Sequence, residues 1–135
     1  MSSERFVLEL DLSASPAEVC AAWLDEAAHS EYTGAPAQID PTVGGTFTAW
    51  DGYISGTTQT IEAPQRIVQA WRTSEFADAD PDSLLELRFA DNGAGGTRLT
   101  LAHSNIPTGQ GKRYEQGWRD FYFEGMTAFF GNGVD

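Results

Sequence analysis

Residues 43–73, VGGTFTAWDGYISGTTQTIEAPQRIVQAWRT, predict three consecutive β-strands at about 45–50, 53–62 and 66–73. Asp51-Gly52 separates the first two strands, and this dipeptide favours a two-residue hairpin, because both central residues of that turn have positive φ. Ala63-Pro64-Gln65 separates the second and third, where proline presets one dihedral of a turn. The segment therefore predicts an antiparallel meander.

Upstream, the sequence predicts one strand followed by helix. Apolar residues alternate with polar ones from Phe6 to Leu12, and a period of two is typical of a half-buried strand. Ser15-Pro16-Ala17-Glu18 has the form of a capping box with proline at the first helical position, so a helix is expected over residues 16–27. A short helical turn is expected at residues 29–32, and residues 34–45 are expected to form a loop.

Downstream, an acidic loop at residues 74–82 precedes two further predicted strands, at residues 83–89 and 97–104. From Gln110 the apolar period changes to 3.6, which predicts an amphipathic helix of roughly 20 residues, or about 30 Å. Gly117 and Gly125 lie inside it, and each costs roughly 1 kcal/mol against alanine. Close backbone approach, space for a ligand, or a plain packing contact would each explain them.

These elements predict an α+β fold. A curved antiparallel sheet of about six strands must bury one face, and the C-terminal helix is the longest apolar element that can cover it. Two short helices follow the first strand. The chain has 135 residues, of which 41% are hydrophobic, so we expect one domain over residues 1–135.

Composition excludes several kinds of partner. The formal net charge is −12, which repels a phosphate backbone and disfavours both nucleic acid and anionic membrane surfaces. No run approaches the roughly 18–20 apolar residues of a membrane span, and the N-terminus lacks a signal-peptide pattern. Cys20 is the single cysteine, so no intrachain disulfide forms. We expect a cytoplasmic protein without membrane insertion.

The sequence carries no strong catalytic, cofactor or metal motif. His29 and His103 are far apart, and no HExxH, CxxC, P-loop or G-x-S-x-G pattern occurs. We therefore assign no catalytic residue, no metal and no cofactor, and an enzyme is the less favoured class. An enzyme would need a titratable group in a pocket, and the first residues to inspect would be His103, Tyr122 and Glu86.

Several motifs together resemble the helix-grip fold of the START/SRPBCC (Bet v-like) superfamily, and within it the proteins similar to the activator of heat shock protein 90 ATPase. The resemblance spans nearly the whole chain. It is carried by Ser15-Pro16-Ala17-Glu18-Val19 with Trp23, Val43-Gly44-Gly45-Thr46-Phe47, Gly52-Tyr53-Ile54-Ser55-Gly56, Pro64-Gln65-Arg66-Ile67-Val68 with Trp71-Arg72, Gly95 to Leu101 with His103-Ser104, and Gly117-Trp118.

The resemblance implies a hydrophobic cavity between sheet and C-terminal helix. The main hypothesis is non-enzymatic binding of a hydrophobic or aromatic small molecule there, neutral or cationic because the protein is acidic. The expected lining residues are Phe47, Tyr53, Trp71, Leu85, Leu87, His103, Trp118 and Tyr122. Tyr122 is the expected polar group on the helix. The other explanation of these side chains is that they fill the core.

Two other functions compete with this hypothesis. One is a cyclase- or hydrolase-like enzyme acting on a cavity-bound substrate. The other is a protein-interaction module, such as a co-chaperone-like stress partner, which would use an exposed apolar patch or an acidic face built from Glu75, Asp78, Asp80 and Asp82. The family name implies a chaperone as that partner. The sequence leaves open whether the chain forms a homodimer.

Overall fold

A seven-stranded antiparallel sheet, with strand order β1-β7-β6-β5-β4-β3-β2, forms one layer of the computed structural model, which describes residues 3–131. Its strands are β1 (Ser3–Leu12), β2 (Gln38–Ile39), β3 (Thr46–Ala49), β4 (Ile54–Glu62), β5 (Arg66–Thr73), β6 (Ser83–Asp91) and β7 (Thr97–Pro107). The helices α1 (Pro16–Leu24) and α2 (Glu26–Thr33) follow β1. The C-terminal helix comprises α3 (Gly111–Gly117), a π-helical segment η1 (Trp118–Phe123) and α4 (Glu124–Phe130). The predicted α+β class is confirmed.

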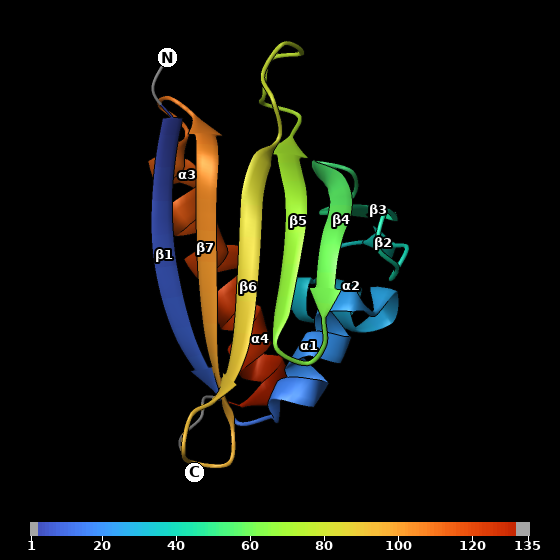
Figure 1. The fold of residues 1–135 in the computed structure, drawn as a ribbon, viewed down its shortest axis with the longest axis vertical. Helices are drawn as coiled ribbons and strands as arrows, with labels where there is room; N and C mark the ends of the chain where they lie inside the picture. The colour runs from blue at the N-terminus through green and yellow to red at the C-terminus, as the bar shows by residue number, and fades with distance from the viewer. Residues whose placement is uncertain (1–2, 132–135) are drawn as a thin grey trace.

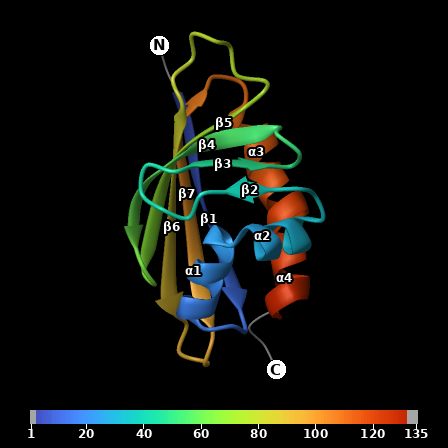
Figure 2. The same ribbon diagram turned by 90° about the vertical axis from the view of Figure 1, so that its right-hand side faces the viewer.

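All helices lie on one face of the sheet, as Figure 1 and Figure 2 show. The C-terminal helix runs along the sheet, and α1 and α2 lie beside its lower half. The inward side chains of the strands, such as Ile67, Leu85 and Leu101, are fully buried against these helices. The outer face is polar and carries ion pairs, including Arg66 with Glu86 at 2.6 Å. The sheet therefore has the one-sided burial that an antiparallel sheet allows.

The first predicted helix is divided in two by Asp25. Ser15 caps α1 as predicted, because its hydroxyl accepts the Glu18 amide at 3.2 Å. The helix ends at Leu24, however, and the Asp25 carboxylate accepts the Ala28 amide at 2.8 Å, which starts α2. The predicted span of residues 16–27 was therefore too long, because a second N-cap competed with continuation of the helix.

The β3–β4 hairpin is confirmed, but its predicted two-residue turn is wrong. Ala49 pairs with Ile54, so four residues form the loop, and Trp50 and Asp51 both have positive φ. Trp50 leaves the strand direction, and its ring packs at 5.5 Å from the ring of Phe121 on the C-terminal helix. Long-range aromatic packing thus overrides the local turn preference. The short strand β2 was also missed, since two residues inside a predicted loop carry no periodic signal.

The C-terminal helix contains two glycines with different surroundings. A Cβ on Gly125 would lie 1.8 Å from the carbonyl oxygen of Tyr32, so this glycine permits close contact between α4 and α2. A Cβ on Gly117 would meet only the Phe121 ring, at 3.8 Å. Packing therefore explains Gly125 and leaves Gly117 beside open space. Within residues 3–131, no helix is both long and apolar enough to cross a membrane.

Candidate functional site

A cavity of about 340 Å³ lies between the C-terminal helix and the strands β4 and β5. Seven of its ten lining residues are aromatic. The lining residues are Trp50, Tyr53, Ile54, Trp71, Arg113, Tyr114, Gly117, Trp118, Phe121 and Tyr122. The cavity meets solvent beside Phe121, whose side chain is 58% exposed. Its size and apolar walls are within the range of small-molecule pockets. We call it the aromatic pocket.

The structure places the eight expected lining residues in three different environments. Tyr53, Trp71, Trp118 and Tyr122 line the aromatic pocket. Phe47 is buried beside a much smaller hollow near Trp23 and Gln69. The remaining three, Leu85, Leu87 and His103, are fully buried in the core.

The pocket also contains residues outside the eight expected ones. Trp50 enters through its positive-φ turn, and Arg113, Tyr114, Gly117 and Phe121 come from the C-terminal helix. The π-helical segment begins at Trp118, so an α-helical projection could not give the orientation of the side chains that follow. Gly117 was the one available signal, because an unexplained glycine inside a helix indicates close approach or open space.

His103 lies behind the pocket wall and is fully bonded. The Trp118 indole N–H donates to Nδ1 at 3.1 Å, so the proton of the neutral ring is on Nε2, which donates to Ser83 Oγ at 2.8 Å. Ser83 in turn donates to the Trp71 carbonyl at 2.7 Å. Burial lowers the pKa of His103 to about 3. In this arrangement His103 donates to the serine, so it does not act as its general base.

His29 forms the second buried polar cluster. Its Nδ1 donates to the Trp23 carbonyl at 3.0 Å, which leaves Nε2 to accept the Tyr122 hydroxyl at 2.9 Å. Burial lowers the pKa of His29 to about 4, and burial likewise raises the pKa of Tyr122. The hydroxyl of Tyr122, which was expected to face a ligand, is therefore directed at His29. Tyr122 contributes its ring to the pocket.

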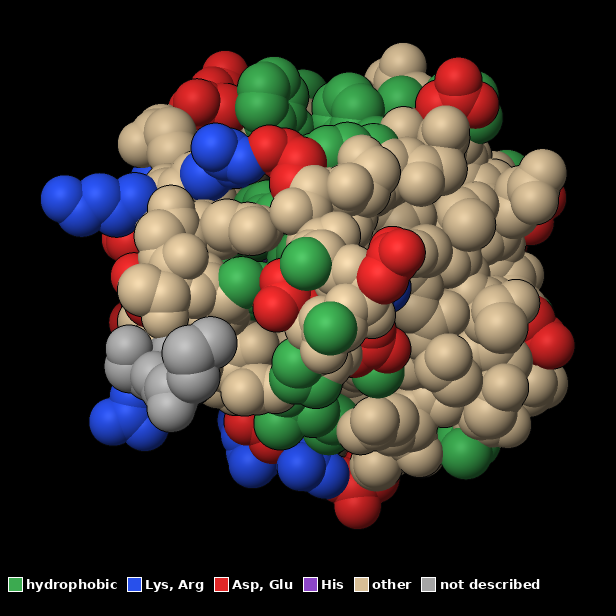
Figure 3. All heavy atoms as spheres, turned by 90° about the horizontal axis from the view of Figure 1, so that it is seen from above, with side chains coloured by type: hydrophobic (Ala, Val, Ile, Leu, Met, Phe, Trp, Pro, Cys, Tyr) green, Lys and Arg blue, Asp and Glu red, His purple; other side chains and the backbone are tan. Residues whose placement is uncertain are grey.

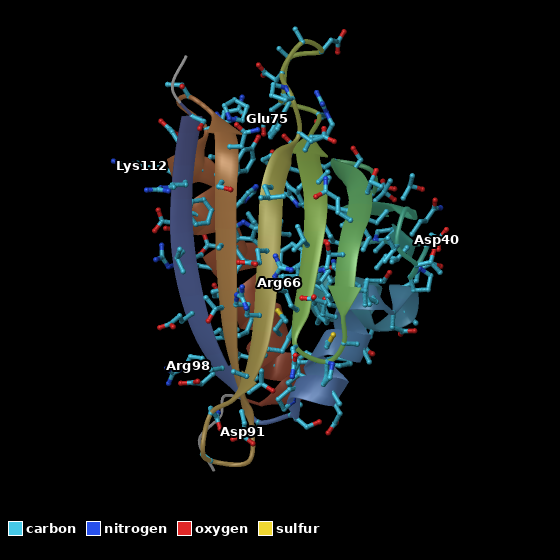
Figure 4. The ribbon with its side chains drawn as sticks, viewed as in Figure 1. Asp40, Arg66, Glu75, Asp91, Arg98 and Lys112 are labelled. Carbon is cyan, nitrogen blue, oxygen red and sulfur yellow. The ribbon has the colours of Figure 1, made fainter. Side chains whose placement is uncertain are left out.

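A polar group of residues closes the upper end of the pocket. The Glu75 carboxylate accepts hydrogen bonds from Tyr53 Oη and from the Arg113 guanidinium. The Tyr114 hydroxyl, next to them, is bonded to Thr73 Oγ1 at 2.7 Å and to Gln110. Burial, and then the bonded Glu75, raise the pKa of Tyr53 to about 12. Figure 4 shows Glu75 near the upper end of the sheet. One paired carboxylate therefore stands at the end of an aromatic pocket.

The residues considered for catalysis are not brought together. Glu86 lies on the outer face of the sheet, where it pairs with Arg66, which is labelled in Figure 4. Tyr122 and His103, in contrast, are buried on the inner side. In the part of the chain that the structure describes, no group of three or more His, Cys, Asp or Glu residues could hold a metal ion. The geometry thus offers a binding cavity with polar groups that are bonded to one another.

The acidic loop between β5 and β6 is largely bonded within itself. Arg72 pairs with Asp82 at 2.8 Å and also donates to the carbonyls of Ala77 and Asp80. The Asp80 carboxylate accepts the Ala77 amide at 2.9 Å, and Glu75 is held by Arg113. Three of the four carboxylates proposed as an acidic face therefore have internal partners.

Comparison with known proteins relates this arrangement to one family. The family described as "Activator of Hsp90 ATPase homolog 1-like protein" matches residues 13–131. The human activator of 90 kDa heat shock protein ATPase homolog 1 is 30% identical over 130 residues, which cover 96% of this chain and 38% of that protein. The chain thus spans well under half the length of that curated relative.

Solved structures give the same relationship. The crystal structure of an HSP90 activator from Plasmodium falciparum superposes with a TM-score of 0.85 at 25% identity, covering 93% of this chain and 94% of that chain. The structure of CalU16 from Micromonospora echinospora superposes with a TM-score of 0.79 at 23% identity, covering 98% of this chain and 78% of that chain. The second likeness is one of fold.

Proposed function

The chain belongs to the activator of Hsp90 ATPase homolog 1-like family, and we propose that it is a protein-interaction module that binds an Hsp90-type chaperone. The observation that carries this proposal is the likeness to the HSP90 activator from Plasmodium falciparum, because that chain is covered almost completely. The two chains therefore correspond over nearly their whole lengths. The proposal places the chain in the cytoplasm, the compartment expected from its single cysteine.

The surface offers an apolar anchor for such a partner. Phe121 is 58% exposed on the C-terminal helix and contacts Trp50 at the mouth of the aromatic pocket. Phe129, two turns later on the same helix, is 40% exposed. Large exposed aromatic side chains rimmed by polar groups are typical of interaction sites, where aromatic residues dominate the binding free energy. We therefore infer that the partner contacts the helix at Phe121.

Replacing Phe121 by serine is expected to weaken chaperone binding by about tenfold or more, because truncating an aromatic anchor removes a large share of the association energy. The measurement is the ATPase rate of a purified Hsp90-type chaperone titrated with the chain. The wild-type chain should raise that rate, and Phe121→Ser should need a correspondingly higher concentration to give the same rise.

Val7→Ser is the matched control for that titration. Val7 is 63% exposed, on β1, and its side chain is on the outer face of the sheet, away from the C-terminal helix. It should leave the titration unchanged. Equal weakening by both variants would place the contact elsewhere, and an ATPase rate unaffected by the wild-type chain would contradict the chaperone proposal itself.

A second function, binding of a small molecule in the aromatic pocket, is favoured by the pocket's volume and lining. The rings of Trp118 and Tyr122 lie 4.6 Å apart, and those of Trp71 and Trp118 lie 5.7 Å apart, yet about 340 Å³ beside them is not filled by side chains. Enclosing an apolar ligand would bury more aromatic surface, which is favourable. This pocket is thus the candidate ligand site.

A leucine in place of Gly117 is expected to abolish ligand-dependent stabilisation, because its side chain would extend from the pocket wall into the cavity, where its Cβ would meet only the Phe121 ring. A ligand at a hundred times its dissociation constant should stabilise the wild-type fold by about 2.7 kcal/mol. Thermal unfolding against a library of apolar small molecules measures this. Lys112→Leu, an exposed position on α3, is the control and should keep the response. A library without any hit on the wild-type chain would contradict ligand binding.

A further inference from the structure

Several hydrogen-bond donors in the walls of the aromatic pocket already have partners within the protein. The Trp118 indole N–H is donated to His103, and the Tyr122 hydroxyl is donated to His29. Tyr53 Oη and the Arg113 guanidinium are both engaged with Glu75. An anionic ligand needs free donors or an unpaired cation to replace its hydration. Because these groups already have internal partners, the pocket is poorly suited to an anion.

The elements on the sheet-edge side of the pocket contribute only negative charge. Residues 13–65, which include α1, α2, β3 and β4, contain no lysine or arginine. The same segment contains seven acidic residues: Glu18, Asp25, Glu26, Glu31, Asp40, Asp51 and Glu62. Seen from above, most basic side chains lie on the left and at the lower centre of the molecule, whereas acidic side chains are spread over the whole face, including the right (Figure 3). The resulting field raises the local concentration of cations at this side.

Aromatic faces attract cations as well. A ring carries negative charge on its faces, and a cation held within about 6 Å of the ring centre is stabilised, most strongly where water is excluded. Seven of the pocket's residues are aromatic, and its one charged lining residue, Arg113, is neutralised by Glu75. The pocket therefore combines negative ring faces, a paired carboxylate at one end and a negative surrounding field.

We propose that the aromatic pocket binds a small organic cation, with an apolar or aromatic body along the rings of Trp71 and Trp118 and an ammonium group toward Glu75. This inference rests on the second candidate function, ligand binding in the same pocket. It specifies that the ligand is positively charged. The positive group contacts ring faces and the Glu75 carboxylate, and the contact with Glu75 partly replaces the Arg113–Glu75 ion pair.

Three isosteric probes of different charge test the proposal. They are (4-hydroxyphenyl)trimethylammonium, the neutral 4-tert-butylphenol and the anionic 4-hydroxybenzenesulfonate, each titrated calorimetrically into the full chain at pH 7 and low salt. The cation is expected to bind about tenfold more tightly than the neutral phenol, the difference that cation–π contact and one nearby carboxylate supply. The sulfonate is expected to bind most weakly.

Two variants separate the site from the overall charge. Glu75→Gln should reduce the ratio of cation to phenol affinity to about twofold or less, while Glu9→Gln, which removes the same charge from the outer face of the sheet, should keep it near tenfold. Phenol binding as tight as cation binding would overturn the charge inference and leave ligand binding intact. Absence of binding for all three probes would overturn both. An equal loss of the ratio in both variants would overturn the role of Glu75.

Discussion

Lowering the pH from 7 to 4.5 is expected to reduce the free energy of unfolding by about 5 kcal/mol, because both histidines are buried in neutral form. Their pKa values fall to about 4 for His29 and about 3 for His103 in the folded protein, against an ordinary value of 6.5. Between these limits the unfolded chain binds protons that the folded protein does not. Stability is therefore complete above pH 6.5 and is lost progressively as the pH falls toward the folded values.

The size of this effect follows from the hydrogen bonds of the two rings. His29 is 4% exposed and His103 is not exposed, and each ring uses one nitrogen as a donor and the other as an acceptor. Protonation converts the accepting nitrogen into a donor: in His103 this donor would face the Trp118 indole N–H, and in His29 the Tyr122 hydroxyl would have to turn to accept it. Each histidine then contributes about 1.4 kcal/mol per pH unit, and small domains have only about 5–15 kcal/mol in total.

Denaturant unfolding at pH 7, 6, 5 and 4.5 measures the slope of stability against pH. His103→Gln should reduce the slope by about half, because only His29 then remains. Asp11, whose pKa is lowered by its bond to Arg98, loses its stabilising contribution mainly as the pH falls below its ordinary value of 3.8. Stability that stays constant between pH 7 and 5 would show that the rings are not held neutral.

Local sequence patterns were sufficient for most of the fold. The strand β5 has the predicted bounds, and Ser15 begins α1 where the capping box indicated. Both depend on residues that are near one another in the chain. The bounds of α2 and the form of the β3–β4 turn were less well predicted. Asp25 caps α2, and Trp50 packs against Phe121, and local preference alone determines neither interaction.

The candidate site was only partly predictable for the same reason. The bond between His29 and Tyr122 joins residues 93 apart, and nothing in either local segment marks it. The strand parity that places Trp71 in the pocket also applies to Leu85 and His103, but those two are completely buried in the core. Which inward side chains line a cavity therefore depends on where the helix lies across the sheet, which periodicity does not specify.

Gly125→Ala is expected to destabilise the fold by about 3 kcal/mol, through overpacking between two helices. The added Cβ would lie 1.8 Å from the Tyr32 carbonyl oxygen, and a backbone atom cannot move aside as a flexible side chain can. The helices α2 and α4 must therefore separate. That separation would disturb the contacts of Tyr32 with Phe129 and Phe130, whose rings lie about 6 Å away.

Gly117→Ala in the same helix is the matched control, and the opposite sign is expected. Its Cβ would meet only Phe121, at 3.8 Å, and φ is −60°, so the replacement should stabilise the fold by up to about 1 kcal/mol through helix propensity. Chemical denaturation of both variants at pH 7 gives the two values. Equal destabilisation by both would mean that Gly117 is also a packing contact, and the open space beside η1 on which the aromatic pocket depends would then be absent.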